Sequence, residues 1–211
     1  MNLEQTRPKF VAVAGNLGVG KSTFVEFICN HGGLKPYFEP NLNNPYLDDF
    51  YRDMKYYAFQ SQLYFLTSKF RIHQQLLKES VSVLQDRTIY EDAEIFAQNL
   101  YRQGYISHRD FSTYWNLYET ISASLEPPDL LIYLECSVNT IMKRVKLRNR
   151  LSEVGLRKDY VRNLNELYQK WFQEYSHSPT LVINTEKLDY ISDIIDRIEI
   201  LDRIRSIIRS D

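Results

Sequence analysis

The sequence lacks an excess of charge of either sign. Its 211 residues carry 26 Lys and Arg against 27 Asp and Glu, which leaves a formal net charge of −1 at neutral pH. A chain so nearly balanced has no global field to attract a polyanion. The balance argues against a motor that works on nucleic acid and against binding to an anionic membrane. We therefore expect neither nucleic acid nor membrane among its partners.

Cysteines and long apolar runs are also scarce. The two cysteines, Cys29 and Cys136, lie far apart and have no metal-ligand spacing. They fit a reducing compartment better than a disulfide-linked secreted scaffold. No apolar run approaches the length of a membrane span, and the N-terminal MNLEQTRPKF has no apolar core for a signal peptide. These absences predict a cytoplasmic protein.

Aromatic residues, in contrast, are abundant at 14% of the chain, with 16 tyrosines and 11 phenylalanines. Most of them must pack in the core, but such a supply also suits a pocket for a flat ring. The length is that of one domain, residues 1–211, with no repeat or linker to divide it.

The segment GNLGVGKST, residues 15–23, has the pattern G-x-x-x-x-G-K-S between an apolar strand and a helix. Its glycines let successive backbone N–H groups face phosphate oxygens at the positive end of that helix. In this pattern the lysine reaches the β- and γ-phosphates, and the serine hydroxyl ligates Mg²⁺. The pattern predicts ATP as cofactor. The residues predicted to bind it are Gly15, Asn16, Gly18, Gly20, Lys21, Ser22 and Thr23.

Apolar runs alternate with helical patterns along the chain. Strands are expected at 10–14, 35–38, 81–85, 129–135 and 180–184, and helices at 21–30, 53–79, 91–102, 108–125, 139–148, 159–175 and 189–209. This alternation indicates a parallel sheet covered on both faces. The predicted fold class is therefore α/β: a P-loop NTPase sandwich with a five-stranded parallel sheet, helices on both faces and an Arg-rich lid. The closing helix is expected to cover the sheet with Ile191, Ile194, Ile195, Ile198, Leu201 and Ile208.

Carboxylates follow two of the expected strands. Glu39 ends the second strand, and Asp86 and Arg87 end the third, so all three face the crevice at the carboxyl edge of the sheet. Glu39 could accept the proton of an attacking hydroxyl, or it could be a turn residue beside Pro40. Asp86 could hold Mg²⁺ while Arg87 orients Glu39 or steadies the transferring phosphate. The alternative is a structural ion pair.

Asp92 and Phe96 are four residues apart and share one face of a helix. A carboxylate beside a ring suits hydrogen bonding and stacking with a base, although a phenylalanine at helical spacing is more often a core residue.

A basic cluster ends the helix after the fourth strand, in the segment proposed as the lid, about residues 144–157. Its members are Arg144, Lys146, Arg148 and Arg150. Guanidinium groups on a movable segment can close over a triphosphate and stabilise developing charge. The alternative is a solvated basic face at a helix C-terminus.

Taken in order, these motifs resemble the deoxyribonucleoside kinase family. The resemblance rests on the P-loop, Glu39-Pro40, Gln62 in YYAFQSQ, DRTIYED at 86–92, and the Arg-rich motif that ends at Glu153. It covers about residues 10 to 185. Each motif alone is modest, but the ordered set with these spacings is specific.

The resemblance implies roles on the acceptor side. Glu39 would be the general base on the 5′-hydroxyl, with Arg87 beside it, and Asp86 would belong with Ser22 to the Mg²⁺ site. Tyr51 and Glu153 would hold the sugar 3′-hydroxyl.

The same resemblance implies a base pocket and a lid. Gln62 would make paired hydrogen bonds to the base, with Asp92 alongside and Phe96 stacked on the ring. Arg144, Arg148 and Arg150 would be lid arginines on the ATP phosphates. Two departures stand out: Asn44 replaces a tryptophan of the animal members, and Lys69 replaces an arginine.

The segments NNPYLDDFY and DRTIYED are more like the bacterial members that phosphorylate deoxyadenosine or deoxyguanosine. The sequence thus predicts an ATP-dependent kinase that transfers the γ-phosphate to the 5′-hydroxyl of a purine deoxyribonucleoside in nucleotide salvage. The resemblance also implies a homodimer packed through helices, for which YETISASL is a candidate.

Two other functions stay open at this point. A nucleoside monophosphate kinase of the thymidylate kinase type shares the predicted fold but grips a phosphate on its acceptor. A non-catalytic nucleotide-binding regulator would keep the P-loop and show no turnover. A Gln–Asp pair can hydrogen-bond more than one base edge, so the residues do not rank the bases.

Overall fold

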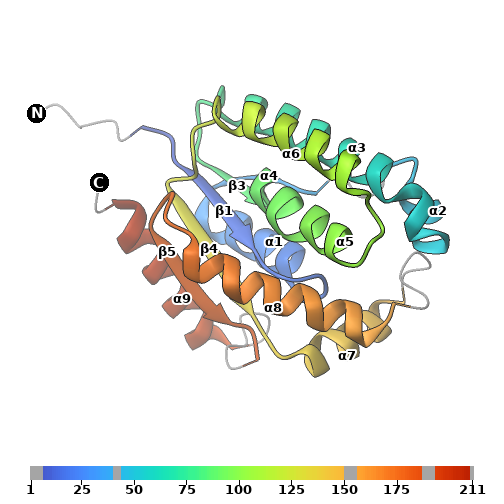
Figure 1. Ribbon diagram of the computed structural model, residues 1–211. Coiled ribbons are helices and arrows are strands. Elements are labelled where there is room, and N and C mark those ends of the chain that lie inside the picture. Colours follow the sequence, from blue (N-terminus) through green and yellow to red (C-terminus); the bar gives the residue numbers. More distant parts are fainter. Residues whose placement is uncertain (1–6, 40–43, 150–155, 187–192, 210–211) are drawn as a thin grey trace, which may run out of the picture.

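The computed structural model describes residues 7–39, 44–149, 156–186 and 193–209 (Figure 1). Its strands are β1 (Phe10–Ala14), β2 (Lys35–Tyr37), β3 (Val83–Asp86), β4 (Leu130–Glu135) and β5 (Thr180–Asn184). They form one parallel sheet in the order β2-β3-β1-β4-β5. The predicted five-stranded parallel sheet is confirmed.

The helices are α1 (Lys21–Gly32), α2 (Leu47–Arg52), α3 (Met54–Leu76), α4 (Ile89–Glu91), the π-helix η2 (Asp92–Ala97), α5 (Gln98–Arg102), α6 (His108–Ser122), α7 (Val138–Arg148), α8 (Lys158–Glu174) and α9 (Ile194–Arg209). Side-chain oxygens cap several of them. Asp53, Ser107 and Ser137 accept the backbone N–H three residues on, which fixes where α3, α6 and α7 begin.

Two apolar cores lie on opposite faces of the sheet, because successive strand residues point to opposite sides. In β1, Phe10, Ala12 and Ala14 join the core under α3, η2, α6 and α8. Val11 and Val13 join the other core, with α1, α7 and α9. Figure 1 shows α3 and α6 running side by side, with α8 on the near side of the sheet. The predicted sandwich with helices on both faces is confirmed.

The prediction that α9 covers the sheet holds for Leu201, which packs against the core, but it is wrong for three of the named isoleucines. Ile194, Ile195 and Ile198 are exposed by 68%, 71% and 55%, whereas Ile200 and Ile204 are buried against the sheet. Ile191 and the side chain of Ile208 lie outside the described residues. Isoleucines occur on several sides of this helix, so their spacing does not select one face.

The helix expected over 91–102 consists of three short pieces, with a π-helix between α4 and α5. Such turns are rare and occur often at functional sites. In the described part of the chain, no helix is long and apolar enough to span a membrane.

Candidate active site

The P-loop connects β1 to α1 at the carboxyl edge of the sheet, and its glycines are required by geometry. Gly15 has φ +148° and Gly18 has φ +72°, values that side-chain-bearing residues rarely adopt. A Cβ on Gly15 would lie 2.6 Å from the backbone oxygen of Leu134, and one on Gly18 would lie 2.9 Å from a methyl of Val145. The loop therefore packs too closely against β4 and α7 for larger residues.

Lys21 is buried at the start of α1 and folds back over the loop. Its Nζ donates to the carbonyl oxygens of Gly15 at 2.9 Å and Asn16 at 3.1 Å. Burial, with the nearby positive charge of Arg87, lowers the pKa of Lys21 to about 8. The Asn16 side chain donates to the carbonyl of Val161 at 3.1 Å, so α8 holds the loop from the other side.

Ser22 and Asp86 face each other where α1 begins and β3 ends. The Ser22 hydroxyl donates to Asp86 Oδ2 at 2.8 Å, and Asp86 Oδ1 is buried with no hydrogen-bond partner in the structure. Hydroxyl and carboxylate oxygens are the donors that Mg²⁺ prefers, and such sites take their remaining ligands from water and substrate phosphates. The described residues contain no cluster of three or more His, Cys, Asp or Glu that could hold a metal without them. The pair thus fits an ion shared with phosphates.

The predicted catalytic residues lie together. Glu39, two residues beyond β2, accepts from Arg87 Nη1 at 2.7 Å, and Lys69 Nζ lies 3.6 Å from the same oxygen. Burial opposes the charge on Arg87, but the negative charge of Glu39, with Glu91 and other groups, outweighs it and holds the Arg87 pKa well above its ordinary value. Arg87 also has φ +62°, a left-handed conformation that is unusual for arginine.

Gln62 on α3, with Asp92 and Phe96 on η2, lines the neighbouring region. Gln62 Oε1 and Asp92 Oδ2 are both buried without a hydrogen-bond partner in the structure. Burial raises the pKa of Asp92 to about 7, against the opposing pull of Lys69. The Arg87 guanidinium lies 4.4 Å from the centre of the Phe96 ring. Unpaired buried acceptors beside an aromatic ring can accept hydrogen bonds from a bound ring system.

Glu91 was given no role by the sequence, yet it joins three parts of the site. Its carboxylate accepts from the backbone N–H groups of Gly15 at 3.2 Å and Thr88 at 2.9 Å, and from the Tyr168 hydroxyl at 2.9 Å. Burial raises its pKa, although Arg87 opposes the rise. The signal that could have found it is T-x-x-E at 88–91, a capping box that the structure confirms at the start of α4.

The remaining predicted residues lie around this centre. Tyr51 lies on α2 with its ring against Phe50, and Arg148 is exposed at the end of α7. Arg144 donates to the carbonyl of Val19 at 2.7 Å and to the Thr185 hydroxyl at 2.9 Å, so it joins the P-loop to the end of β5. The lid residues Arg150 and Glu153 lie outside the described residues.

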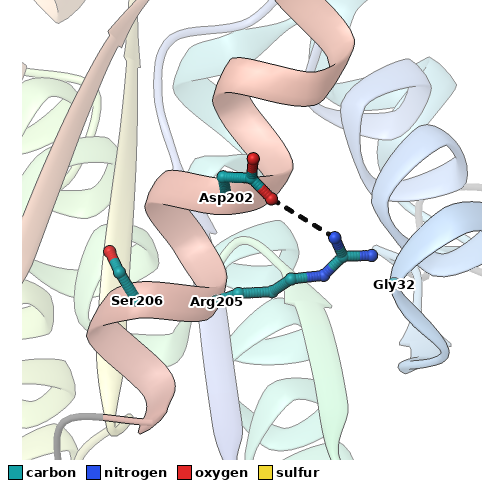
Figure 2. A pocket seen from close by; sticks show the side chains of 4 residues that line it. All are labelled: Gly32, Asp202, Arg205 and Ser206. Atoms are coloured by element: carbon teal, nitrogen blue, oxygen red, sulfur yellow. Dashed lines mark hydrogen bonds and ion pairs between the residues drawn. The ribbon is translucent and has the colours of Figure 1, made fainter.

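A hollow between α1 and α9 lies at the end of α1 farthest from the P-loop (Figure 2). Gly32, Asp202, Arg205 and Ser206 line it, and Arg205 pairs with Asp202 at 3.4 Å. No predicted site residue contributes to this hollow.

Comparison with known proteins identifies the family of the chain. Residues 11–209 match the family model named deoxynucleoside kinase. The chain belongs to the deoxynucleoside kinase family. It is therefore a kinase, and the activity of this family implies ATP as the phosphate donor.

Individual relatives of this kinase match over most of its length. The deoxyadenosine kinase of Dictyostelium discoideum is 39% identical over 82% of this chain and 71% of its own. The deoxyadenosine/deoxycytidine kinase of Bacillus subtilis is 33% identical over 95% of this chain and 94% of its own. The structure of M. mycoides deoxyadenosine kinase with bound dATP is 29% identical, has a TM-score of 0.83 and covers 93% of this chain and 99% of its own.

Proposed function

We propose that this kinase transfers the γ-phosphate of ATP to the 5′-hydroxyl of a purine deoxyribonucleoside, with Glu39 as the general base. The observation that carries the proposal is the Glu39–Arg87 pair at 2.7 Å, whose two side chains are each only 9% exposed. It lies at the same edge of the sheet as the P-loop, where an acceptor hydroxyl and the γ-phosphate can meet in line.

Each residue of this edge then has a task. Glu39 accepts the hydroxyl proton, and Arg87 holds the carboxylate in place and balances its charge. Lys21 leaves the loop carbonyls to reach the phosphates. Ser22 and Asp86 would hold Mg²⁺, which neutralises charge on the phosphates when it is bound.

The base pocket is compatible with a purine. The Gln62 amide offers an N–H donor and a carbonyl acceptor, which suit an amino group beside a ring nitrogen, a pattern that adenine and cytosine share. Asp92 adds a hydrogen bond and Phe96 stacks on the ring. The purine choice rests on the relatives described above: two are named for deoxyadenosine, and the Bacillus subtilis enzyme is named for deoxyadenosine and deoxycytidine.

The other assignments extend the same proposal. Tyr51 and Glu153 hold the sugar 3′-hydroxyl, and Arg144, Arg148 and Arg150 serve the ATP phosphates. The enzyme works in the cytoplasm, since its two distant cysteines fit a reducing compartment. Its role there is nucleotide salvage. It functions as a homodimer that packs through α6, on which the partly exposed Leu117 supplies apolar surface.

Initial rates with Mg-ATP test the proposal. The acceptors are deoxyadenosine, deoxyguanosine, deoxycytidine, thymidine and their monophosphates. We expect turnover of a purine deoxyribonucleoside that falls by roughly 10² to 10⁴-fold in Glu39→Gln, the range for loss of a general base. The matched control is Glu79→Gln, since Glu79 pairs with Lys35 at the opposite edge of the sheet and its loss leaves activity unchanged.

Three results would overturn parts of it. Turnover of monophosphates alone would identify a kinase of the thymidylate kinase type. Tight ATP binding without any turnover would indicate a regulator. A preference for deoxycytidine would refute the purine assignment while leaving the catalytic carboxylate intact.

A further inference from the structure

We propose that Lys69 is a positioning residue that holds the catalytic Glu39–Arg87 pair in place and does not read the base. The inference rests on the proposed function. Lys69 lies in the middle of α3. It is one of the few buried lysines among the described residues, and 0% of its surface is exposed. A buried ammonium is costly unless each of its donors has a partner.

The contacts of Lys69 are with the turn that carries Arg87 and with Glu39. Its Nζ donates to the backbone carbonyl of Arg87 at 2.7 Å and to that of Asp86 at 3.1 Å. The same nitrogen forms an ion pair with Glu39 at 3.6 Å. An ammonium has three N–H donors and no acceptor, so two of them bind backbone carbonyls of the turn after β3, and the charge of the group faces the Glu39 carboxylate.

The two carbonyls matter because of the conformation of Arg87. With φ +62°, this residue has a left-handed backbone that costs energy for any side chain other than hydrogen. Its N–H donates to the carbonyl of Val13 at 2.9 Å, which fixes the turn from the side of β1. Lys69 fixes the same turn from the side of α3, by binding the carbonyl before and the carbonyl after the strained φ.

Lys69 therefore acts at both ends of the catalytic pair. It stabilises the backbone that aims the Arg87 guanidinium at Glu39, and it supplies a second positive charge to the Glu39 carboxylate. Both effects bear on proton abstraction and phosphoryl transfer, which are chemical steps. Neither is a contact with the base, which the proposal assigns to Gln62 and Asp92; toward that pocket Lys69 contributes only its charge, which opposes the raised pKa of Asp92.

The test is a steady-state comparison of wild type, Lys69→Met and Lys69→Arg on deoxyadenosine, deoxyguanosine and deoxycytidine at saturating ATP. We expect Lys69→Met to lower kcat on the order of 100-fold for each base, with KM and the preference among bases nearly unchanged. Lys69→Arg regains the charge but brings a planar fork in place of a compact ammonium, so it recovers only part of kcat. A raised KM with an altered order of bases, at unchanged kcat, would overturn the proposal.

The control is His73→Gln, one turn further along α3. His73 is equally buried and lies 2.8 Å from the carbonyl of Glu126, outside the active site. We expect it to lower the melting temperature without changing kcat. If Lys69→Met does not fold, Lys69→Arg decides alone, and a wild-type kcat with an altered order of bases in that variant would refute the role. Failure of the proposed function would look different, because wild type itself would then phosphorylate none of the deoxyribonucleosides.

Discussion

Asp92 is the buried carboxylate whose ionisation should be most visible in stability. Burial raises its pKa from 3.8 to about 7, and Oδ2 has no hydrogen-bond partner in the structure. An acid whose pKa is higher in the folded state stabilises the fold below its unfolded pKa, and that stabilisation is lost as the pH rises to the folded pKa. Asp92→Asn keeps the shape and cannot ionise.

The magnitude follows from the shift. Between pH 4 and pH 7 the folded protein holds one proton that the unfolded chain has released, so wild type should lose about 1.4 kcal/mol per pH unit relative to the variant. Between pH 5 and pH 8 the difference in unfolding free energy should therefore change by about 2 to 3 kcal/mol in favour of Asp92→Asn, and it should be level above pH 7.

Urea unfolding of both proteins without ligand, at half-unit pH steps from 5 to 9, measures this difference directly. Groups common to both proteins cancel in the subtraction, since only Asp92 differs. Two parallel curves over this range would refute the reasoning, because they would mean that Lys69 keeps Asp92 ionised throughout the folded state.

Two further predictions concern the P-loop. Gly15→Ala places a Cβ 2.6 Å from the backbone oxygen of Leu134, so calorimetry should show that ATP binding is lost. The control is Gly33→Ala, whose Cβ meets no atom within 4 Å and which adds only conformational strain of about 1 to 2 kcal/mol. Unchanged ATP binding in Gly15→Ala would contradict the packing argument. Glu91→Gln puts an amide donor against either the Gly15 N–H or the Thr88 N–H, and urea unfolding should show a loss of about 1 to 3 kcal/mol. An unfolding free energy unchanged within about 0.5 kcal/mol would mean that Glu91 is not the link between them.

The strands could be predicted from the sequence because β1, β3 and β4 are buried on both faces or nearly so, and β5 buries every second residue. Runs such as FVAVA and TLVIN are short, apolar and followed by turn residues, and β1 and β5 begin and end where expected. The π-helix could not be found this way, since its six residues are too few to separate its period from that of an α-helix. The buried face of α9 could not be predicted because isoleucines occur on several sides of this helix.

The site was predictable where it follows the sheet. Asp86 ends β3 and Glu39 follows the end of β2 by two residues, and parallel strands bring their carboxyl ends to one edge. Glu91 and Lys69 do not follow this rule. Glu91 lies inside DRTIYED at 86–92, between residues with assigned roles, and its own role depends on contacts that the motif does not show. Lys69 lies in the middle of a helix, 30 positions from the Glu39 carboxylate that it contacts. Only the packing of α3 against the turn after β3 brings them together.

The active site contains many buried charges, and each of them needs hydrogen-bond or ion-pair partners that the sequence does not reveal. Its buried cations are Lys21, Lys69 and Arg87, and its buried or nearly buried carboxylates are Glu39, Asp86, Glu91 and Asp92. Each would be costly alone, because burial removes water without replacing it. Arg87 touches Glu39, Lys69 bridges to the same oxygen, and Glu91 collects backbone N–H groups. Asp92 is left with the poorest compensation, and a purine that donates to its free oxygen would supply what the protein does not. Binding of the base should therefore lower the pKa of Asp92, and the substrate should stabilise the fold most strongly above pH 7.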